Sequence, residues 1–113
     1  MAWLVSQGRV LGSVEVAGTA RTRSRGLLGR DGIEGAILLQ PARSVHTFGM
    51  RFAIDVAFLD RDGTVLRVRT LVPGRITRPV WAVRSVIEAE AGMMARWGLH
   101  EGDRVEVRAR AEP

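Results

Sequence analysis

The sequence contains no cysteine, no lysine and no tyrosine, and only two histidines. The absence of cysteine excludes disulfides, zinc–thiolate sites and cysteine nucleophiles. Two histidines provide little capacity for acid–base catalysis near neutral pH. No apolar run approaches the roughly 20 residues that a membrane-spanning helix needs. The N-terminus lacks a basic region followed by a long apolar stretch, so we expect no signal peptide and a cytoplasmic protein.

Familiar site motifs are also missing. There is no Gly-x-Ser-x-Gly, no phosphate-binding loop and no dinucleotide fingerprint, and no regularly spaced pair of histidines on a helix. We therefore expect no cofactor and no metal. What the sequence does contain is 113 residues with 46% hydrophobic and 26% charged content. These values are typical of one globular domain, over residues 1–113, with its own hydrophobic core.

The positive charge is unevenly distributed. All 17 basic residues are arginines, and the formal net charge is +5. Residues 16–30 and residues 64–86 carry several arginines each, and neither stretch has an acidic residue. If these stretches share a face, they attract anions, although a solvated surface or GC-rich codon usage explains the same pattern. Nucleic acid is the less favoured partner, because aromatic and basic residues do not alternate as in an RNA-recognition strand.

Period-two alternation and turn residues predict six or seven short strands and two short helices. The first helix is expected to begin at Thr19 or Thr22, to run to Leu28, and to send Leu27 and Leu28 into the core. Residues 91–97 predict a second helix. We predict a mainly β (α+β) domain, a compact barrel-like antiparallel sheet. The expected strands cover residues 1–5, 9–16, 36–39, 53–60, 64–71, 82–90 and 104–109.

Two loops are candidates for ligand contact. Residues 45–51 lead into the apolar strand over residues 53–60. That strand is followed by Asp62-Gly63, a pair typical of a tight hairpin turn into residues 64–71. Residues 73–79 form a second irregular segment, with Trp81 expected to anchor its far end. Loops of this length in compact domains are often functional.

Three blocks follow one another along the chain: Arg25-Gly26-Leu27-Leu28-Gly29-Arg30, the run from His46 to Asp60, and Val86-Ile87-Glu88 followed by Gly92, Gly98-Leu99 and Gly102-Asp103-x-Val105. In this order they resemble the family catalogued as domain of unknown function 192. Many members of that family have Phe-Trp-Met-Lys-Asn-Thr where this chain has Thr-Phe-Gly-Met-Arg-Phe, so the larger aromatic and the Asn-Thr pair are absent here. The resemblance implies a small β-rich, barrel-like domain and no established activity.

Three titratable residues can be given functional roles. His46 is either a general base or metal ligand, or a residue that holds its loop by hydrogen bonds. Asp55 lies inside an apolar strand, where a carboxylate must be paired, hydrogen-bonded or protonated. A structural role is favoured for Asp55, as the partner of an arginine or of loop N–H groups. Glu88 paired with Asp55 would give a two-carboxylate site, and with His46 an incomplete metal site.

We therefore predict a small binding domain for an anionic small molecule or peptide, without evident catalytic machinery. The alternative is a small enzyme that uses His46 with Asp55 or Glu88 as an acid/base pair or metal site. Binding is favoured because no nucleophile with an adjacent base is visible. The candidate ligand-binding residues are His46, Thr47, Phe48, Met50, Arg51, Asp55, Glu88 and Arg25.

Overall fold

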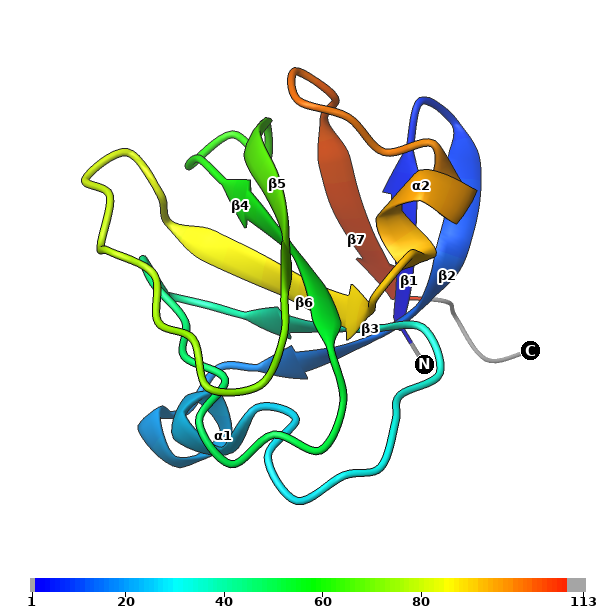
Figure 1. The fold of residues 1–113 in the computed structure, drawn as a ribbon. Coiled ribbons are helices and arrows are strands. Elements are labelled where there is room, and N and C mark those ends of the chain that lie inside the picture. The colour runs from blue at the N-terminus through cyan, green and yellow to red at the C-terminus, as the bar shows by residue number, and fades with distance from the viewer. Residues whose placement is uncertain (1, 110–113) are drawn as a thin grey trace.

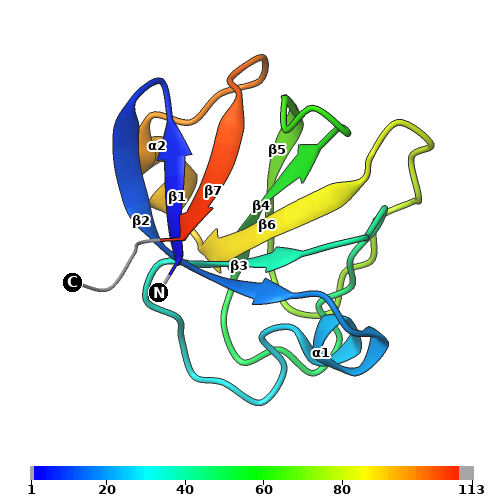
Figure 2. The same ribbon diagram turned by 180° about the vertical axis from the view of Figure 1, so that it is seen from behind.

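The computed structural model describes residues 2–109, so Met1 of the first expected strand lies outside the described residues. One seven-stranded sheet carries two short helices at opposite ends of the molecule (Figures 1 and 2). The strand order is β5-β4-β6-β3-β2-β1-β7. The mainly β prediction is confirmed. The elements are β1 (Ala2–Ser6), β2 (Arg9–Ala17), α1 (Ala20–Arg25), β3 (Ala36–Leu39), β4 (Ile54–Leu59), β5 (Val65–Leu71), β6 (Ser85–Glu90), α2 (Met93–Trp97) and β7 (Val105–Ala109).

The sheet is coiled but open. Neighbouring strands are antiparallel except for the parallel pair β2–β3. The two terminal strands approach each other at the isolated bridge between Thr64 and Arg104. There the backbone N–H of Val65 donates to the carbonyl of Asp103 at 2.8 Å. The expected barrel-like shape therefore holds only loosely, because the bridge does not close the sheet.

Strand β4 is buried on both faces. Ile54, Val56 and Phe58 pack into one core cluster, which also holds Leu27 near α1 and which we call the α1-side cluster. Residues 57 and 59 pack into the other cluster, which also holds Met94 and Trp97 of α2 and which we call the α2-side cluster. Side chains alternate between the two faces of a strand. The sequence of β4 is almost continuously apolar because the strand lies between two cores and buries both of its faces.

Helix α1 begins with a reciprocal cap. The Thr19 hydroxyl accepts from the Thr22 backbone N–H at 3.1 Å, and the Thr22 hydroxyl accepts from the Thr19 backbone N–H at 3.1 Å. Such a capping box satisfies donors that a helix start leaves unpaired. The helix ends at Arg25, before the predicted end at Leu28. Leu27 is buried as expected, but Leu28 is 38% exposed, so its placement in the core was wrong.

The hairpin β4–β5 forms as predicted. The Asp60 carboxylate accepts from the backbone N–H groups of Asp62 and Thr64 at 2.9 and 3.0 Å, and Gly63 takes a positive φ of 81°. The following loop runs to Arg84, so β6 is shorter at its start than the strand predicted from residue 82. Trp81 is 80% exposed and does not anchor that loop in the core.

No helix within residues 2–109 is both long enough and apolar enough to cross a membrane.

Candidate functional site

A cavity of about 200 Å³ lies between α1, the segment over residues 44–50 and β6. It borders the α1-side cluster, from which Leu27 and Leu39 contribute to its wall. The space is small, below the roughly 300 Å³ at which ligand pockets of drug size begin. The cavity is lined by Arg23, Ser24, Arg25, Gly26, Leu27, Leu28, Leu39, Ser44, Val45, His46, Phe48, Met50 and Glu88.

Glu88 provides the buried acid of this cavity. It is the fourth residue of β6, pairs with Ile37 and Val56 on the neighbouring strands, and is 4% exposed. Burial raises the pKa of Glu88 to about 7, and desolvation is the only cause of the shift. A carboxyl group in such a site exchanges its proton near neutral pH. It can therefore donate a hydrogen bond when protonated and repel an anion when ionised.

Gly26 allows the backbone after α1 to approach that carboxyl group. Its φ is 46°, in a region that side-chain-bearing residues rarely adopt. A Cβ atom added at Gly26 would lie 3.2 Å from Oε1 of Glu88. The absence of a side chain at this position therefore keeps the space beside the Glu88 carboxyl group open.

His46 and Phe48 form the outer wall. Their rings are stacked with centroids 5.6 Å apart and an interplanar angle of 25°. Both side chains are exposed, and Phe48 is 52% exposed. His46 and Glu88, which are far apart in sequence, line the same cavity. No hydrogen bond joins the two side chains among the described residues.

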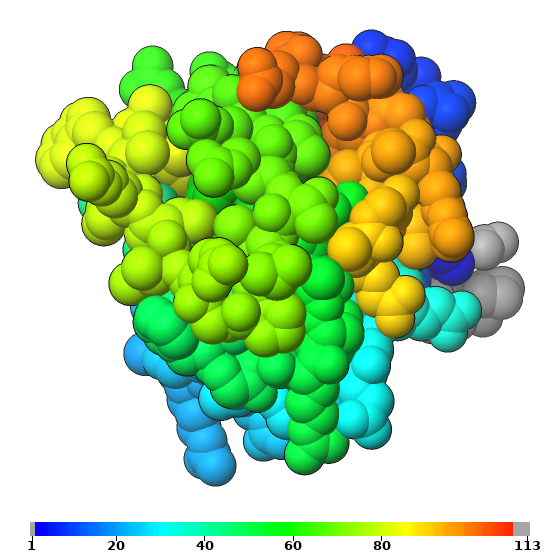
Figure 3. Space-filling view, in the orientation of Figure 1, coloured from blue at the N-terminus to red at the C-terminus, as the bar shows by residue number. Residues whose placement is uncertain are grey.

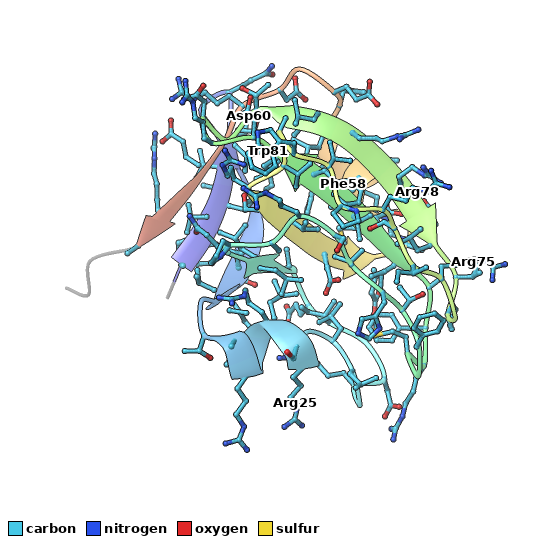
Figure 4. The ribbon with its side chains drawn as sticks, turned by 90° about the vertical axis from the view of Figure 1, so that its left-hand side faces the viewer. Arg25, Phe58, Asp60, Arg75, Arg78 and Trp81 are labelled. Carbon is cyan, nitrogen blue, oxygen red and sulfur yellow. The ribbon has the colours of Figure 1, made fainter. Side chains whose placement is uncertain are left out.

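Basic groups surround the mouth. Arg25 is exposed, and its side chain extends outward from α1 (Figure 4). The Arg23 guanidinium donates to the carbonyl of Gly18 at 2.9 Å, which holds it beside the helix. The ion pairs within residues 2–109 involve neither arginine. Two guanidinium groups and one imidazole thus accompany a single buried acid.

Thr47 lies between His46 and Phe48 but faces the protein interior. It is fully buried; its hydroxyl donates to the Val72 carbonyl at 2.8 Å and accepts from the Arg75 backbone N–H at 2.8 Å. The His46–Ile76 bridge continues the same pairing. Thr47 therefore ties the cavity wall to the loop after β5, and its side chain does not line the cavity.

Asp55 lies elsewhere and is fully occupied. It is 3% exposed, and its carboxylate accepts from the Thr70 hydroxyl at 2.6 Å. The other oxygen accepts from the backbone N–H groups of Gly92 and Met94 at 2.9 and 3.1 Å. These two donors belong to the start of α2, whose N–H groups would otherwise be unpaired. Asp55 thus holds α2 on the sheet and does not reach the cavity.

The other predicted residues divide in the same way. Met50 lines the cavity, whereas Arg51 points to solvent and pairs with Asp31 at 3.0 Å. The structure brings together His46, Phe48, Met50, Arg25 and Glu88, and leaves out Thr47, Arg51 and Asp55. Sequence reasoning missed Ser24 and Ser44, which also line the cavity. Nothing in their local sequence distinguishes them from ordinary loop serines.

The metal alternative has no geometric support in this region. Within residues 2–109, no three histidine, aspartate or glutamate side chains are grouped as ligands of one ion would be. Glu88 and His46 would supply two ligands at most, whereas protein zinc sites use three or four.

Known proteins resemble this chain in sequence. A sequence model of the family described as "Uncharacterized ACR" (DUF192) matches residues 2–107. A UPF0127 protein of Pyrococcus abyssi is 36% identical over 100 residues, covering 84% of this chain and 86% of that protein. A UPF0127 protein of Pyrococcus horikoshii is 31% identical over 99 residues, covering 83% and 86%.

Two crystal structures have a similar fold. A protein of unknown function from Novosphingobium aromaticivorans superimposes with a TM-score of 0.79 at 22% identity, covering 93% of this chain and 82% of that chain. The second comes from Sinorhizobium meliloti and has a suggested role as a transcription regulator. It superimposes with a TM-score of 0.77 at 26% identity, covering 94% and 91%. The likeness extends over nearly the whole of this chain.

Proposed function

The chain belongs to the DUF192 family, and we propose that its cavity between α1 and β6 binds a small anionic molecule such as a short carboxylic acid. The observation that carries this proposal is the convergence of Arg25, His46 and Glu88, which are distant in sequence, on one cavity. A concave site with a few polar groups and a titratable residue of shifted pKa is the usual setting of a ligand site.

The charge balance favours an anion. Arg23, Arg25 and His46 line the cavity together with a single acid, Glu88. Burial raises the pKa of Glu88 to about 7, so a large fraction of this group is neutral at physiological pH. In that form it can donate a hydrogen bond to a carboxylate or phosphate oxygen. The binding of an anion would favour the protonated form further, because a nearby like charge disfavours ionisation.

The size and lining of the cavity limit the ligand to a few non-hydrogen atoms. About 200 Å³ is available, and Leu28, Leu39 and Phe48 supply apolar surface beside the polar groups. A short carboxylic acid matches this combination, with its charged end at the arginines and its hydrocarbon end on the leucines. Apolar contact would add roughly 0.8 kcal/mol for each buried methylene group.

Catalysis is the second candidate, and it is tied to the same cavity. His46 and Glu88 both line it, so an acid–base pair acting through a bound ligand is geometrically conceivable. Binding is favoured because Ser24 and Ser44, the serines that line the cavity, have no hydrogen bond to His46 among the described residues. A serine nucleophile needs such an adjacent base.

Binding is tested by following backbone amide shifts by NMR while acetate, propionate or inorganic phosphate is added. We expect shifts at residues 23–28 and 44–50, and an affinity that falls as pH rises above about 7, where Glu88 ionises. Glu88→Gln keeps a neutral donor and should remove that pH dependence. His46→Gln should weaken binding, whereas His100→Gln, a change at the exposed second histidine, should not.

Shifts spread over surface arginines, or an affinity with the same pH dependence in Glu88→Gln, would contradict the proposal. If small ammonium compounds bound instead, and more tightly as the pH rises, the cavity would be a cation site and the proposal would be wrong. If anions bind and an ester such as p-nitrophenyl acetate is also hydrolysed faster by the protein than by its His46→Gln variant, the catalytic alternative replaces simple binding.

A further inference from the structure

A second hollow lies on another face, between β5 and the loop that follows it. It encloses about 450 Å³ and shares no lining residue with the cavity. β5 and the loop lie side by side on this face of the molecule (Figure 3). Arg67, Arg69 and Leu71 alternate with other residues along β5 and form one wall. We call this hollow the β5 groove; it is lined by Phe58, Leu66, Arg67, Arg69, Leu71, Arg75, Ile76, Thr77, Arg78, Val80 and Val83.

The groove has an exposed aliphatic surface. Ile76 is 70% exposed, Val80 48% and Leu66 38%. Isolated exposed apolar residues are common, but here three of them line one hollow. Their burial by a partner would remove apolar area from water, the main source of favourable free energy in most associations.

The rim of the groove is basic and has no acid. Arg67 and Arg69 lie on β5, and Arg75 and Arg78 lie on the opposite loop, with side chains that extend outward (Figure 4). Within residues 2–109, none of these four arginines forms an ion pair with a carboxylate. A partner with carboxylate groups would therefore meet available guanidinium groups on both sides.

We propose that the β5 groove binds an extended, acidic segment of another protein, with leucine-like side chains on the groove floor and carboxylates at the arginines. The groove is bounded by a strand and a loop, which suits a chain in extended conformation. In such a segment alternate side chains point to the same side. The proposal does not rest on the small-molecule cavity, since the two sites share no lining residue.

The floor favours a peptide over single-stranded nucleic acid. Bases bind by stacking on accessible aromatic rings. The aromatic residue in the groove, Phe58, is 6% exposed. Trp81 is exposed nearby, but the guanidinium groups of Arg43 and Arg84 lie over its ring, 4.8 and 5.9 Å from the centroid. Aliphatic side chains, by contrast, match the aliphatic floor.

The test uses a fluorescein-labelled peptide with two leucines separated by one glutamate and flanked by glutamates. Binding to the full chain is measured by fluorescence anisotropy. A peptide with both leucines replaced by serine, and a labelled single-stranded oligonucleotide, are measured in parallel. We expect the leucine peptide to bind at least about tenfold more tightly than the serine peptide, a difference that corresponds to partial burial of two apolar side chains.

Charge-matched variants locate the site. Arg75→Glu combined with Arg78→Glu should weaken peptide binding about tenfold or more, because attraction becomes repulsion at the rim. Arg21→Glu combined with Arg96→Glu changes the net charge equally at exposed positions on the two helices and should have little effect. Ile76→Ser should weaken binding several-fold. Val10→Ser, at a valine that is 62% exposed on β2, should not.

Three results would overturn the proposal. The first is equal weakening by both charge-reversal pairs, which would indicate a diffuse electrostatic effect. The second is equal binding of the leucine and serine peptides, or no binding of either. The third is tighter binding of the oligonucleotide with loss in the Arg75→Glu, Arg78→Glu variant, which would assign the groove to nucleic acid. His46→Gln should leave peptide binding unchanged, so a failure of the cavity proposal does not affect this test.

Discussion

Asp55 and Glu88 lie on adjacent strands, yet their carboxyl groups emerge on opposite faces of the sheet. In the β4–β6 register Asp55 pairs with Ala89, and Val56 pairs with Glu88. The one-residue offset sends Asp55 towards α2 and Glu88 towards α1, because successive side chains alternate between faces. One small ligand cannot contact both. The two-carboxylate site considered from sequence is therefore replaced by two separate carboxyl groups with different surroundings.

We predict that Asp55→Asn lowers the free energy of unfolding by about 2–4 kcal/mol, since the amide cannot accept all three hydrogen bonds of the buried carboxylate. Urea denaturation measures the change. Asp31→Asn is the matched control, because its carboxylate forms an exposed ion pair with Arg51. That variant should change stability by less than about 1 kcal/mol. An Asp55→Asn protein with unchanged stability and lost acetate binding would instead make Asp55 a ligand-binding group.

Glu88→Gln should make stability less dependent on pH. Burial raises the pKa of Glu88 in the folded chain to about 7, above its ordinary value of 4.5. The folded protein therefore holds a proton that the unfolded chain releases, and the wild type loses stability as pH rises between these values. The loss is at most about 3 kcal/mol by proton linkage. The variant lacks this loss and should be the more stable protein near pH 8.

Denaturation measures the free energy of unfolding of both proteins at about pH 4 and pH 8. The effect is the change, between the two pH values, in the gap between wild type and Glu88→Gln. A constant gap between wild type and Glu88→Gln at the two pH values would mean that Glu88 titrates normally in the folded protein.

Gly26→Ala should reduce both stability and anion binding. The positive φ of Gly26 and the 3.2 Å approach of a Cβ to Oε1 of Glu88 both oppose the substitution. Gly74→Ala is the matched control: its φ is +86°, with nothing within 4 Å of the added Cβ. Both variants incur a backbone cost of about 1–2 kcal/mol. Only Gly26→Ala should also weaken acetate binding, and equal affinities in the two variants would place the ligand away from Glu88.

Thr47→Val should loosen the loop after β5. Valine keeps the shape of threonine but leaves the Val72 carbonyl and the Arg75 N–H without the hydroxyl partner they have at 2.8 Å. We expect a loss of about 1–3 kcal/mol for such buried polar groups. Faster hydrogen exchange at residues 72–77, with unchanged exchange in β1 and β2, is the expected signature. Uniformly faster exchange over the whole sheet would contradict a local role.

The fold could be predicted from sequence where turn residues, strand alternation and helix-capping residues agree. The Asp62-Gly63 turn and the alternation around it predicted the β4–β5 hairpin. Thr19 and Thr22 were the two predicted starts of α1, and Thr19 is the one observed. The parallel pair β2–β3 was not foreseen, because strand pairing depends on contacts between distant residues. Leu28 was misplaced in the core because α1 ends at Arg25, and the chain then turns it towards solvent.

The candidate site could be predicted only in part from the sequence. The composition of residues 45–51 identified a promising segment, but alternation in the structure turns Thr47 inward and leaves its neighbours His46 and Phe48 at the cavity. The role of Glu88 depends on the close approach of Gly26, a contact between positions far apart in the chain. No local pattern encodes that contact. The arginines of residues 64–86 and the loop over residues 73–79 were noted from sequence, but only the fold brings them together as the β5 groove.

The most direct test of the anion-binding account is a ¹³C NMR titration of the Glu88 side-chain carboxyl carbon, with and without saturating acetate. The account predicts a pKa of about 7 in the free protein and a higher pKa in the complex, because the bound anion favours the protonated carboxyl group. A pKa close to the ordinary glutamate value, or a raised pKa that acetate leaves unchanged, would contradict it.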